Sequence, residues 1–191
     1  MKVLAIQGSY NKTGNSAHLL DKFLDGLKTK QECTVKRYDV AHLTIGLCRG
    51  CYACSKHDDY FCAQKDDAPA ILVDYLDADL VVFSYPVYFI GIPGQVKNLV
   101  DRFVGFYKGG EVKGQYVGKF AAKQVVTIVN CAEDNESYCR DAGKGIGGLI
   151  YCIPSKYEEL YVPGCYGEGI VAKDAAKQKK AFDFGVKMGS K

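Results

Sequence analysis

The sequence predicts an α/β fold, a doubly wound five-stranded parallel sheet with helices on both faces. Five short, largely apolar strand patterns alternate along the chain with helical patterns, and alternation of this kind requires parallel strands joined by crossover helices. The 191 residues contain no internal repeat, no low-complexity segment and no linker rich in Pro, Gly or Ser. A single domain spanning residues 1–191 is therefore expected.

The five strands are predicted from apolar runs that end in turn residues. KVLAIQ, at 2–7, is almost continuously apolar, as expected of a parallel strand that is buried on both faces. ADLVVFSYP, at 78–86, has the same character and predicts the central strand, whereas the alternating TVKRYDV predicts a more exposed one. The predicted strands are 2–7, 34–40, 78–86, 124–130 and 157–164.

Helices are predicted where apolar residues recur every three or four positions. A helix that begins at Ser16 carries its apolar residues on one face, and they are Leu19, Leu20, Phe23, Leu24 and Leu27. Asp66 or Asp67 is expected to cap the helix that precedes the third strand. Further helices are predicted near 96–103, 135–152 and 173–188, and the Gly-rich 135–152 has the weakest pattern of the three.

Composition and charge exclude several classes of function. The net charge is +3 and the Lys and Arg residues form no stripe, so no nucleic acid partner is expected. The first apolar run ends at Gly8, too early for a secretory signal, and the apolar stretch 80–92 is too short to span a membrane. We expect a cytoplasmic location, where nine cysteines would stay mostly reduced and a disulfide scaffold is disfavoured.

The loop GSYNKTGNS, at 8–16, joins the first strand to the first helix and has the composition of an anion site. In doubly wound sheets, ligands bind at the carboxyl ends of the strands, where this loop begins. Its glycines allow a tight path, its polar side chains offer donors, and the positive end of the following helix dipole faces the same space. The loop matches neither a Walker motif nor GxGxxG. It is interpreted as a phosphate site, and a loop that merely caps the helix is the alternative.

A second loop, YPVYFIGIPG at 85–94, follows the central strand and exposes an unusual amount of aromatic and aliphatic surface. Either another subunit covers this surface or a flat apolar ligand lies on it. A phosphate site and a flat apolar ledge at one sheet edge together describe a pocket for flavin mononucleotide, FMN. The exposed ledge at 88–92 and the cysteine loop also predict a homodimer or a larger assembly.

These motifs resemble those of the flavodoxin-like NAD(P)H-dependent FMN reductase superfamily over essentially the whole chain. The segments that carry the resemblance are GSYNKTGNS, the CxxCxxC loop ending in KDD, YPVYFIGIPGQVKNLVDRF and the tail GEGIVAKDAAKQKKAFDFG. The resemblance implies one set of residues that hold the FMN phosphate, namely Ser9, Asn11, Asn15 and Ser16. It implies a second set that runs along the isoalloxazine ring, namely Pro86, Val87, Tyr88 and Phe89.

The chain departs from the family pattern at two places. Asn11 stands where the family often has Arg, so one charge partner of the phosphate is missing, and Lys12 is a candidate substitute. After the fourth strand, where the family often has a glycine-rich turn, this chain has NCAEDNE at 130–136. Its acidic residues are expected either to narrow the substrate cleft or to point away from it.

The resemblance implies two alternative functions. In the first, the protein is an enzyme that oxidises NAD(P)H and reduces a quinone, a free flavin or another small acceptor. In the second, it is an iron–sulfur flavoprotein that carries electrons between protein partners of the ferredoxin type. FMN supplies its own reactivity, so no catalytic acid or base is nominated, and His18, His42 and His57 form no ligand pair.

The cysteine loop bears on this choice. CxxCxxC followed by a later cysteine provides four thiols, and these are Cys48, Cys51, Cys54 and Cys62. Their number and spacing suit a 4Fe–4S cluster, and the run resembles that of the iron–sulfur flavoproteins. Free thiols that pack as small hydrophobic groups, a zinc site and a reversible disulfide remain the alternatives. Cys33, Cys131, Cys139, Cys152 and Cys165 lack such spacing and are expected to be buried small side chains.

Overall fold

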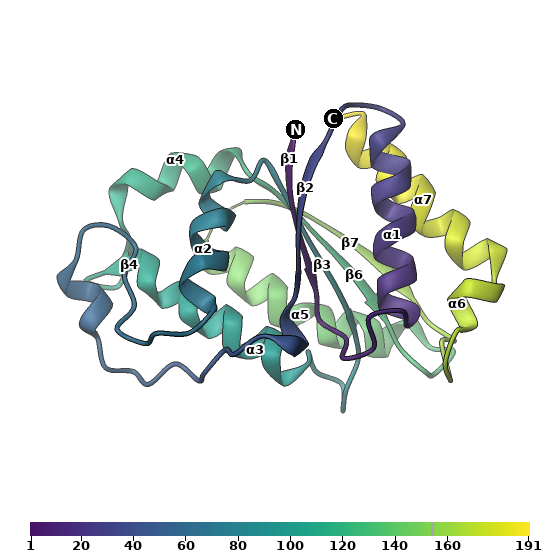
Figure 1. Cartoon of the computed structure of the whole chain (residues 1–191), viewed down its shortest axis with the longest axis horizontal. Coiled ribbons are helices and arrows are strands. Elements are labelled where there is room, and N and C mark those ends of the chain that lie inside the picture. The colour runs from purple at the N-terminus through teal and green to yellow at the C-terminus, as the bar shows by residue number, and fades with distance from the viewer. Residues whose placement is uncertain (154) are drawn as a thin grey trace.

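A computed structural model describes residues 1–153 and 155–191, and it confirms the doubly wound α/β architecture (Figure 1). Five parallel strands form one sheet in the order β2-β1-β3-β6-β7. Their bounds are Lys2–Gln7 for β1, Thr34–Asp39 for β2, Leu80–Pro86 for β3, Gln124–Asn130 for β6 and Lys156–Val162 for β7. All five predicted strands are present, with ends that differ from the predicted ones by at most two residues.

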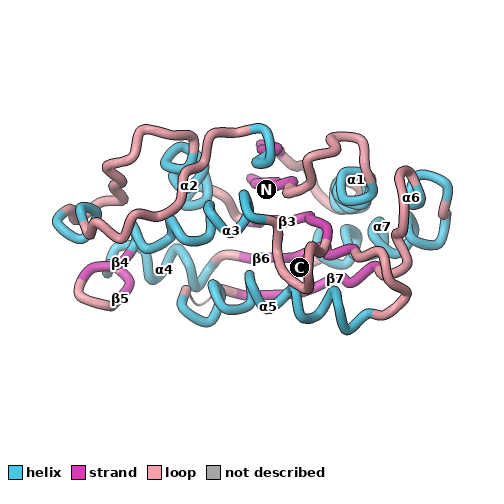
Figure 2. The backbone as a smooth tube through the Cα atoms, turned by 90° about the horizontal axis from the view of Figure 1, so that it is seen from below, coloured by secondary structure: helices cyan, strands magenta, loops and turns pink. Residues whose placement is uncertain are grey.

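Helices cover both faces of the sheet, as the tube in Figure 2 shows from below. One face carries α1 (Asn15–Lys28), α6 (Ile170–Lys173) and α7 (Ala175–Gly189). The other carries α2 (Ala68–Asp77), α3 (Gly94–Asp101), α4 (Gly114–Ala122) and α5 (Glu136–Cys152). Each face therefore has its own apolar core.

The strand sequences follow from these two cores. Along β1, Val3 and Ala5 pack with α1 and α7, whereas Leu4 and Ile6 pack on the opposite face. A strand with helices on both sides buries nearly all of its side chains, and in β1 every residue after Lys2 is buried, which explains the continuous apolar run. The edge strand β2 has no fully buried residue, in agreement with its alternating sequence.

The helices α1 and α7 approach so closely that two glycines are required at their contact. A Cβ atom on Gly26 would collide with the backbone of Phe182, and one on Gly185 would collide with the backbone of Phe23. Because these obstacles are backbone atoms, a larger residue would push the two helices apart. Docking of the C-terminal helix on α1 matters for the site described below, since the segment that leads into α7 forms one of its walls.

The region 102–122 differs from the prediction. The helix expected near 96–103 is α-helical only to Asp101 and continues as a 3₁₀ helix, η3 (Arg102–Phe106). A short hairpin, β4 (Tyr107–Lys108) with β5 (Glu111–Val112), and the helix α4 follow, and neither was predicted. Only two residues of α4, Tyr116 and Phe120, are buried, so the sequence offers too few apolar positions to show a helical period.

The cysteine segment is mostly irregular, as expected, and is interrupted by two 3₁₀ turns, η1 (Val40–His42) and η2 (Ala53–Lys56). In Figure 1 it runs away from the sheet, past α2 and towards β4. The side chain of Asp66 lies at the start of α2, where its Oδ1 accepts a hydrogen bond from the N–H of Ala68 at 3.2 Å. The other candidate, Asp67, instead accepts a hydrogen bond from the N–H of Thr44.

Candidate functional site

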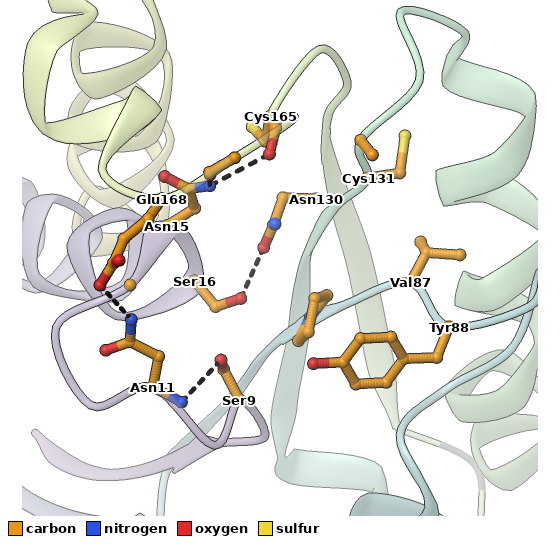
Figure 3. A pocket seen from close by; sticks show the side chains of 14 residues that line it. Ser9, Asn11, Asn15, Ser16, Val87, Tyr88, Asn130, Cys131, Cys165 and Glu168 are labelled. Atoms are coloured by element: carbon orange, nitrogen blue, oxygen red, sulfur yellow. Dashed lines mark hydrogen bonds between the residues drawn. The ribbon is translucent and has the colours of Figure 1, made fainter.

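A pocket of about 340 Å³ lies where β1, β3 and β6 end. These strands include the switch point of the sheet order, because the chain continues from β1 to opposite sides at β2 and β3. Four segments line the pocket: residues 9–16, 86–88, 130–132 and 165–168. Figure 3 shows Ser9, Asn11, Asn15 and Ser16 on one side of it and Val87 and Tyr88 on the other.

The loop 8–16 is shaped by its own hydrogen bonds. The Oγ atom of Ser9 accepts from the N–H of Asn11 at 3.2 Å, and Oδ1 of Asn11 accepts from the N–H of Thr13 at 3.0 Å. Gly8 is packed so closely against β3 that a Cβ atom there would lie 2.9 Å from Cβ of Tyr85. The backbone of the loop is thus pressed against the sheet edge, and its polar groups turn towards the pocket.

The N-terminus of α1 opens into the same pocket. Within the described residues, no side chain caps this helix, whose N-cap residue is Gly14, and its first turn has no acidic residue. The first N–H groups of a helix have no partner inside it, and the dipole makes this end positive. An uncapped 14-residue helix at a pocket wall is therefore suited to an anion such as a phosphate.

Ser16 connects this helix to the central strands. Its hydroxyl donates to Oδ1 of Asn130 at 2.6 Å, and its carbonyl accepts from the hydroxyl of Ser84 at 2.8 Å. All three side chains are buried. The network holds the start of α1 against the ends of β3 and β6.

Two asparagines of the loop hold the fourth wall in place. Asn15 donates to the carbonyls of Cys165 and Gly167, and its Oδ1 accepts from the N–H of Val171. Asn11 donates to a carboxylate oxygen of Glu168 at 2.9 Å, a contact drawn in Figure 3. Both amide side chains thus face the pocket while they are bonded to the segment 165–171.

The apolar side of the pocket consists of Pro86, Val87 and Tyr88. The N–H of Val87 donates to the carbonyl of Asn130 at 2.9 Å, which joins the two strand ends. Phe89 does not line the pocket and is fully exposed. It occupies, with Ile90, a two-residue turn in which Tyr88 and Gly91 exchange backbone hydrogen bonds and both central residues have positive φ.

Several lining residues were not predicted. They are Asn130, Cys131 and Ala132 after β6, and Cys165, Gly167 and Glu168 before α6. The first group opens the NCAEDNE segment, for which only the acidic residues were considered in relation to the cleft; Glu133, Asp134 and Glu136 do not line the pocket. The second group begins immediately before the tail that carries the resemblance and overlaps it, but its hydrogen bonds to Asn11 and Asn15 span about 150 residues and leave no local sequence signal.

The four cysteines of the motif line a second, separate cavity of about 100 Å³. Cys48, Cys51, Cys54 and Cys62 share it with Arg102 and with apolar residues of the 3₁₀ helix η3. Among the described residues, no three His, Cys, Asp or Glu side chains lie close enough together to hold a metal ion. The thiols therefore surround a common space rather than converge on one point.

Arg102 anchors this second cavity. Its guanidinium is buried, donates to both carboxylate oxygens of Asp66 at 2.6 and 3.1 Å, and donates to Sγ of Cys62 at 3.0 Å. Burial by itself would raise the pKa of Asp66, but hydrogen bonds from Arg102 and from backbone N–H groups outweigh burial and hold that pKa below its usual value. A cationic group is thus fixed against the sulfur of Cys62.

Lys113 also holds the cysteine segment in place, through hydrogen bonds to backbone carbonyls. Its ammonium group donates to the carbonyls of Cys54, Asp59 and Gly105, at 3.3, 2.8 and 2.8 Å. Burial raises the pKa of the Cys54 thiol. The irregular cysteine loop therefore has a defined shape, although it contains little regular secondary structure.

His18, His42 and His57 line neither cavity. His42 interacts with the carbonyl of Tyr10 at 2.7 Å, and the ring of His57 stacks on Phe61. No helix in the described part of the chain is long and apolar enough to cross a membrane.

The sequence model of the family described as NADPH-dependent FMN reductase matches residues 1–133. An iron–sulfur flavoprotein of Archaeoglobus fulgidus is 40% identical over 105 residues, which cover 53% of this chain and 48% of that protein. An iron–sulfur flavoprotein of Methanocaldococcus jannaschii is 30% identical over 118 residues, with 60% of each chain covered. The chain spans between about half and three-fifths of the length of the curated relatives it matches.

Solved structures confirm the flavodoxin-like fold. A flavone reductase superposes with a TM-score of 0.74 at 19% identity, covering 100% of this chain and 62% of that one. An NAD(P)H:quinone oxidoreductase from Methanothermobacter marburgensis gives a TM-score of 0.69 at 16% identity, covering 99% and 95%. An FMN-dependent NADH-azoreductase from Bacillus anthracis, solved in complex with FMN, gives 0.71 at 12% identity, covering 100% and 98%.

Proposed function

The chain belongs to the NADPH-dependent FMN reductase family, and from this premise we propose that it binds FMN and oxidises NAD(P)H, passing the electrons to a quinone, a free flavin or another small acceptor. The observation that carries the proposal is the composition of one pocket. An uncapped helix N-terminus and an apolar, partly aromatic edge face each other across about 340 Å³ at the switch point of the sheet. A flavin nucleotide has an anion at one end and a flat apolar ring system at the other.

The residues present fit FMN at both ends. The hydroxyl of Ser9 and the first N–H groups of α1 would bind the phosphate, and Ser16, Asn11 and Asn15 would hold the walls around it. Val87 and Tyr88 would pack along the ring. Among the described lining residues, Glu168 is the one charged side chain, so neutral donors and the helix dipole would balance the phosphate charge.

Bound FMN supplies a hydride acceptor that can also release electrons one or two at a time. The chain need only bind, orient and partly shield that group. Tyr88 is half-exposed at the pocket rim, which leaves one side of the ring position open to a nicotinamide or to an acceptor. No histidine lines the pocket, and no side chain is assigned as a catalytic acid or base.

Anaerobic stopped-flow mixing tests the proposal directly. The holoprotein is mixed with NADH or NADPH, and the visible absorption band of the flavin is followed. We expect the band to bleach with at least one of the two nucleotides and to recover when a quinone is added. A flavin that neither nucleotide reduces would contradict the enzymatic function.

A second function is favoured by a specific observation, the cavity lined by four thiols. An iron–sulfur cluster is larger than a single metal ion, so four cysteines that surround a space without converging on one point suit it better than they suit zinc. The iron–sulfur flavoproteins among the relatives lend weight to this reading. As the alternative function, the protein would hold a 4Fe–4S cluster and carry electrons to a ferredoxin-type partner.

The assembly state belongs to the same proposal. The turn at Phe89 and Ile90 exposes apolar surface next to the pocket, and a second copy of the chain that covered it would also shield the flavin ring. We therefore propose that the chain forms a homodimer or a larger assembly and that it acts in the cytoplasm.

A further inference from the structure

Two cysteines outside the motif meet at the edge of the flavin pocket. Cys131 follows β6 directly and lines the pocket, and Cys139 lies near the start of α5. Their Sγ atoms are 3.2 Å apart, and the thiol of Cys139 is directed at the sulfur of Cys131. Only 4% of Cys131 and 0% of Cys139 is exposed to solvent.

The surrounding contacts hold the pair together. The side chain of Asn135 accepts a hydrogen bond from the N–H of Ser137 and so fixes the start of α5, one turn before Cys139. The carbonyl of Cys131 accepts from the N–H of Cys165 at 2.8 Å, which fixes the other member. An isolated buried cysteine is usually a small hydrophobic side chain, but a second thiol at this distance adds a specific chemistry.

That chemistry is reversible disulfide formation. A disulfide requires about 2.05 Å between the sulfur atoms, so the thiols need to approach by about 1.2 Å. The thiol of Cys165 points to the backbone carbonyls of Val162 and Pro163 instead.

We propose that Cys131 and Cys139 form a two-electron redox pair beside the flavin, oxidised by a hydroperoxide and reduced by the flavin. The inference rests on the proposed binding of FMN. It adds a second redox site to the chain and a class of oxidant, hydroperoxides, that would enter through the same pocket.

The oxidation balances in two steps. The sulfur of Cys131, the member of the pair that lines the pocket, attacks one oxygen of hydrogen peroxide; the O–O bond breaks, a sulfenic acid forms and one water leaves. The thiol of Cys139 then displaces the sulfenic oxygen, so that the S–S bond forms and a second water leaves. Reduction reverses the bond change: two electrons and two protons from the reduced flavin break the S–S bond and restore two thiols.

The environment suits these separate roles. Burial raises the pKa of the Cys139 thiol far above neutrality, with a smaller contribution from the hydrogen bond to Cys131. Cys139 is therefore the uncharged, sheltered partner, whereas Cys131 is the member of the pair that lines the pocket.

The experiment uses the FMN-loaded protein under anaerobic conditions. One equivalent of hydrogen peroxide is added, the protein is denatured in N-ethylmaleimide, and peptide mapping identifies linked cysteines. We expect a Cys131–Cys139 disulfide. A parallel sample is then photoreduced until the flavin bleaches and is incubated in the dark. In this sample we expect the visible absorbance of the flavin to return, as one reduced flavin per chain passes two electrons to one disulfide. Both thiols should reappear at the same time.

Variants separate this pair from the other cysteines. In Cys139→Ala and in the closer isostere Cys139→Ser, the dark recovery should vanish, and a second equivalent of peroxide should drive Cys131 from the sulfenic to the sulfinic acid. Cys152→Ala, at the exposed end of the same helix, should behave as the wild type.

Two outcomes would overturn the inference while the proposed function stands: Cys131 and Cys139 stay as free thiols under peroxide, or their disulfide survives flavin reduction. A protein that holds no FMN would overturn both.

Discussion

Ser16 and Asn130 are 114 residues apart in the sequence, and a buried hydrogen bond of 2.6 Å joins them at the base of the pocket. The bond connects the first turn of α1 to the carboxyl end of β6. Through it, the element that would bind the phosphate and the element that carries Cys131 are held at a constant separation.

Replacement of Ser16 by Ala should destabilise the flavin-free protein. The change leaves Oδ1 of Asn130 buried without a donor, and an unsatisfied buried acceptor costs about 1–3 kcal/mol. Urea unfolding monitored by circular dichroism measures the loss. Ser190→Ala, near the exposed C-terminus, serves as the control and should change the free energy of unfolding very little. Equal stability of the two variants would contradict the role given to the Ser16–Asn130 bond.

Replacement of Ser9 by Ala should weaken FMN binding more than it weakens the fold. The Oγ atom of Ser9 already accepts from Asn11, so its proton is available for a phosphate oxygen, and a hydrogen bond to a charged group contributes about 1.5–3 kcal/mol. Flavin fluorescence titration should therefore show at least a tenfold rise in the FMN dissociation constant. Riboflavin, which has no phosphate, should bind both proteins equally. An unchanged FMN affinity would remove the loop 8–16 from the phosphate site.

The turn at Phe89 and Ile90 should be stabilised by residues that tolerate positive φ. Both residues lie in the left-handed region, with φ of 46° and 63°, where Asn and Gly are preferred in two-residue turns. Phe89→Asn combined with Ile90→Gly should raise the stability of the monomer by about 1 kcal/mol. The same change should weaken the homodimer in sedimentation experiments, because it removes exposed apolar surface.

Tyr151→Asn is the matched control for that experiment. Tyr151 is 91% exposed and lies at the far end of α5, away from the turn. Loss of its ring should leave association unchanged. A dimer that survives the double change in the turn but not the control would exclude the turn from the interface.

Lys123 should give the stability a pH dependence in the alkaline range. Its side chain is buried and bonded to the carbonyl of Ala78, and burial lowers its pKa from 10.5 to about 8. Between these two values the unfolded chain binds more protons than the folded one, so stability rises with pH. The free energy of unfolding of the wild type should therefore rise relative to Lys123→Met from about pH 8 to 10.5. Lys119→Met, exposed on the neighbouring helix α4, should show no such rise.

The cavity lined by the four cysteines of the motif can be tested for a cluster by measuring iron. If it holds a cluster, protein isolated without oxygen should be brown and contain about four irons and four sulfides per chain. Cys54→Ser should lose most of the iron and keep FMN, since the two cavities share no residue. Cys33→Ser should keep both. Absence of iron after anaerobic reconstitution, together with full reductase activity in Cys54→Ser, would identify the loop as a packing element.

The strands and most helices could be predicted because their signals are local. An apolar run such as 80–86 identifies a buried strand by itself, and the spacing of apolar residues in 15–28 identifies a helix face. The helix α4 was missed because only Tyr116 and Phe120 among its residues are buried. Its position depends on ring contacts of Tyr116 and Phe120 with Phe106 of η3 and with Tyr75, which lies in the earlier helix α2.

The candidate site was predictable in part for the same reason. Seven of the eight residues expected around FMN line one pocket, because they lie in loops that leave neighbouring strands at one sheet edge. The eighth, Phe89, turns away, since the two-residue turn with positive φ directs it into solvent. The cysteine loop lies apart from this pocket, because Arg102 and Lys113 hold it around a cavity of its own.

By itself, the sequence determined the sheet, its two covered faces and the strand ends at which a ligand would bind, because periodicity and burial are properties of short segments. Only the tertiary structure decided which distant side chains meet. It joined Asn15 to the segment before α6, aimed Arg102 at Cys62, and brought Cys139 to 3.2 Å from Cys131. These contacts depend on how helices dock on the sheet, and docking is set by the packing of the whole core rather than by any one segment.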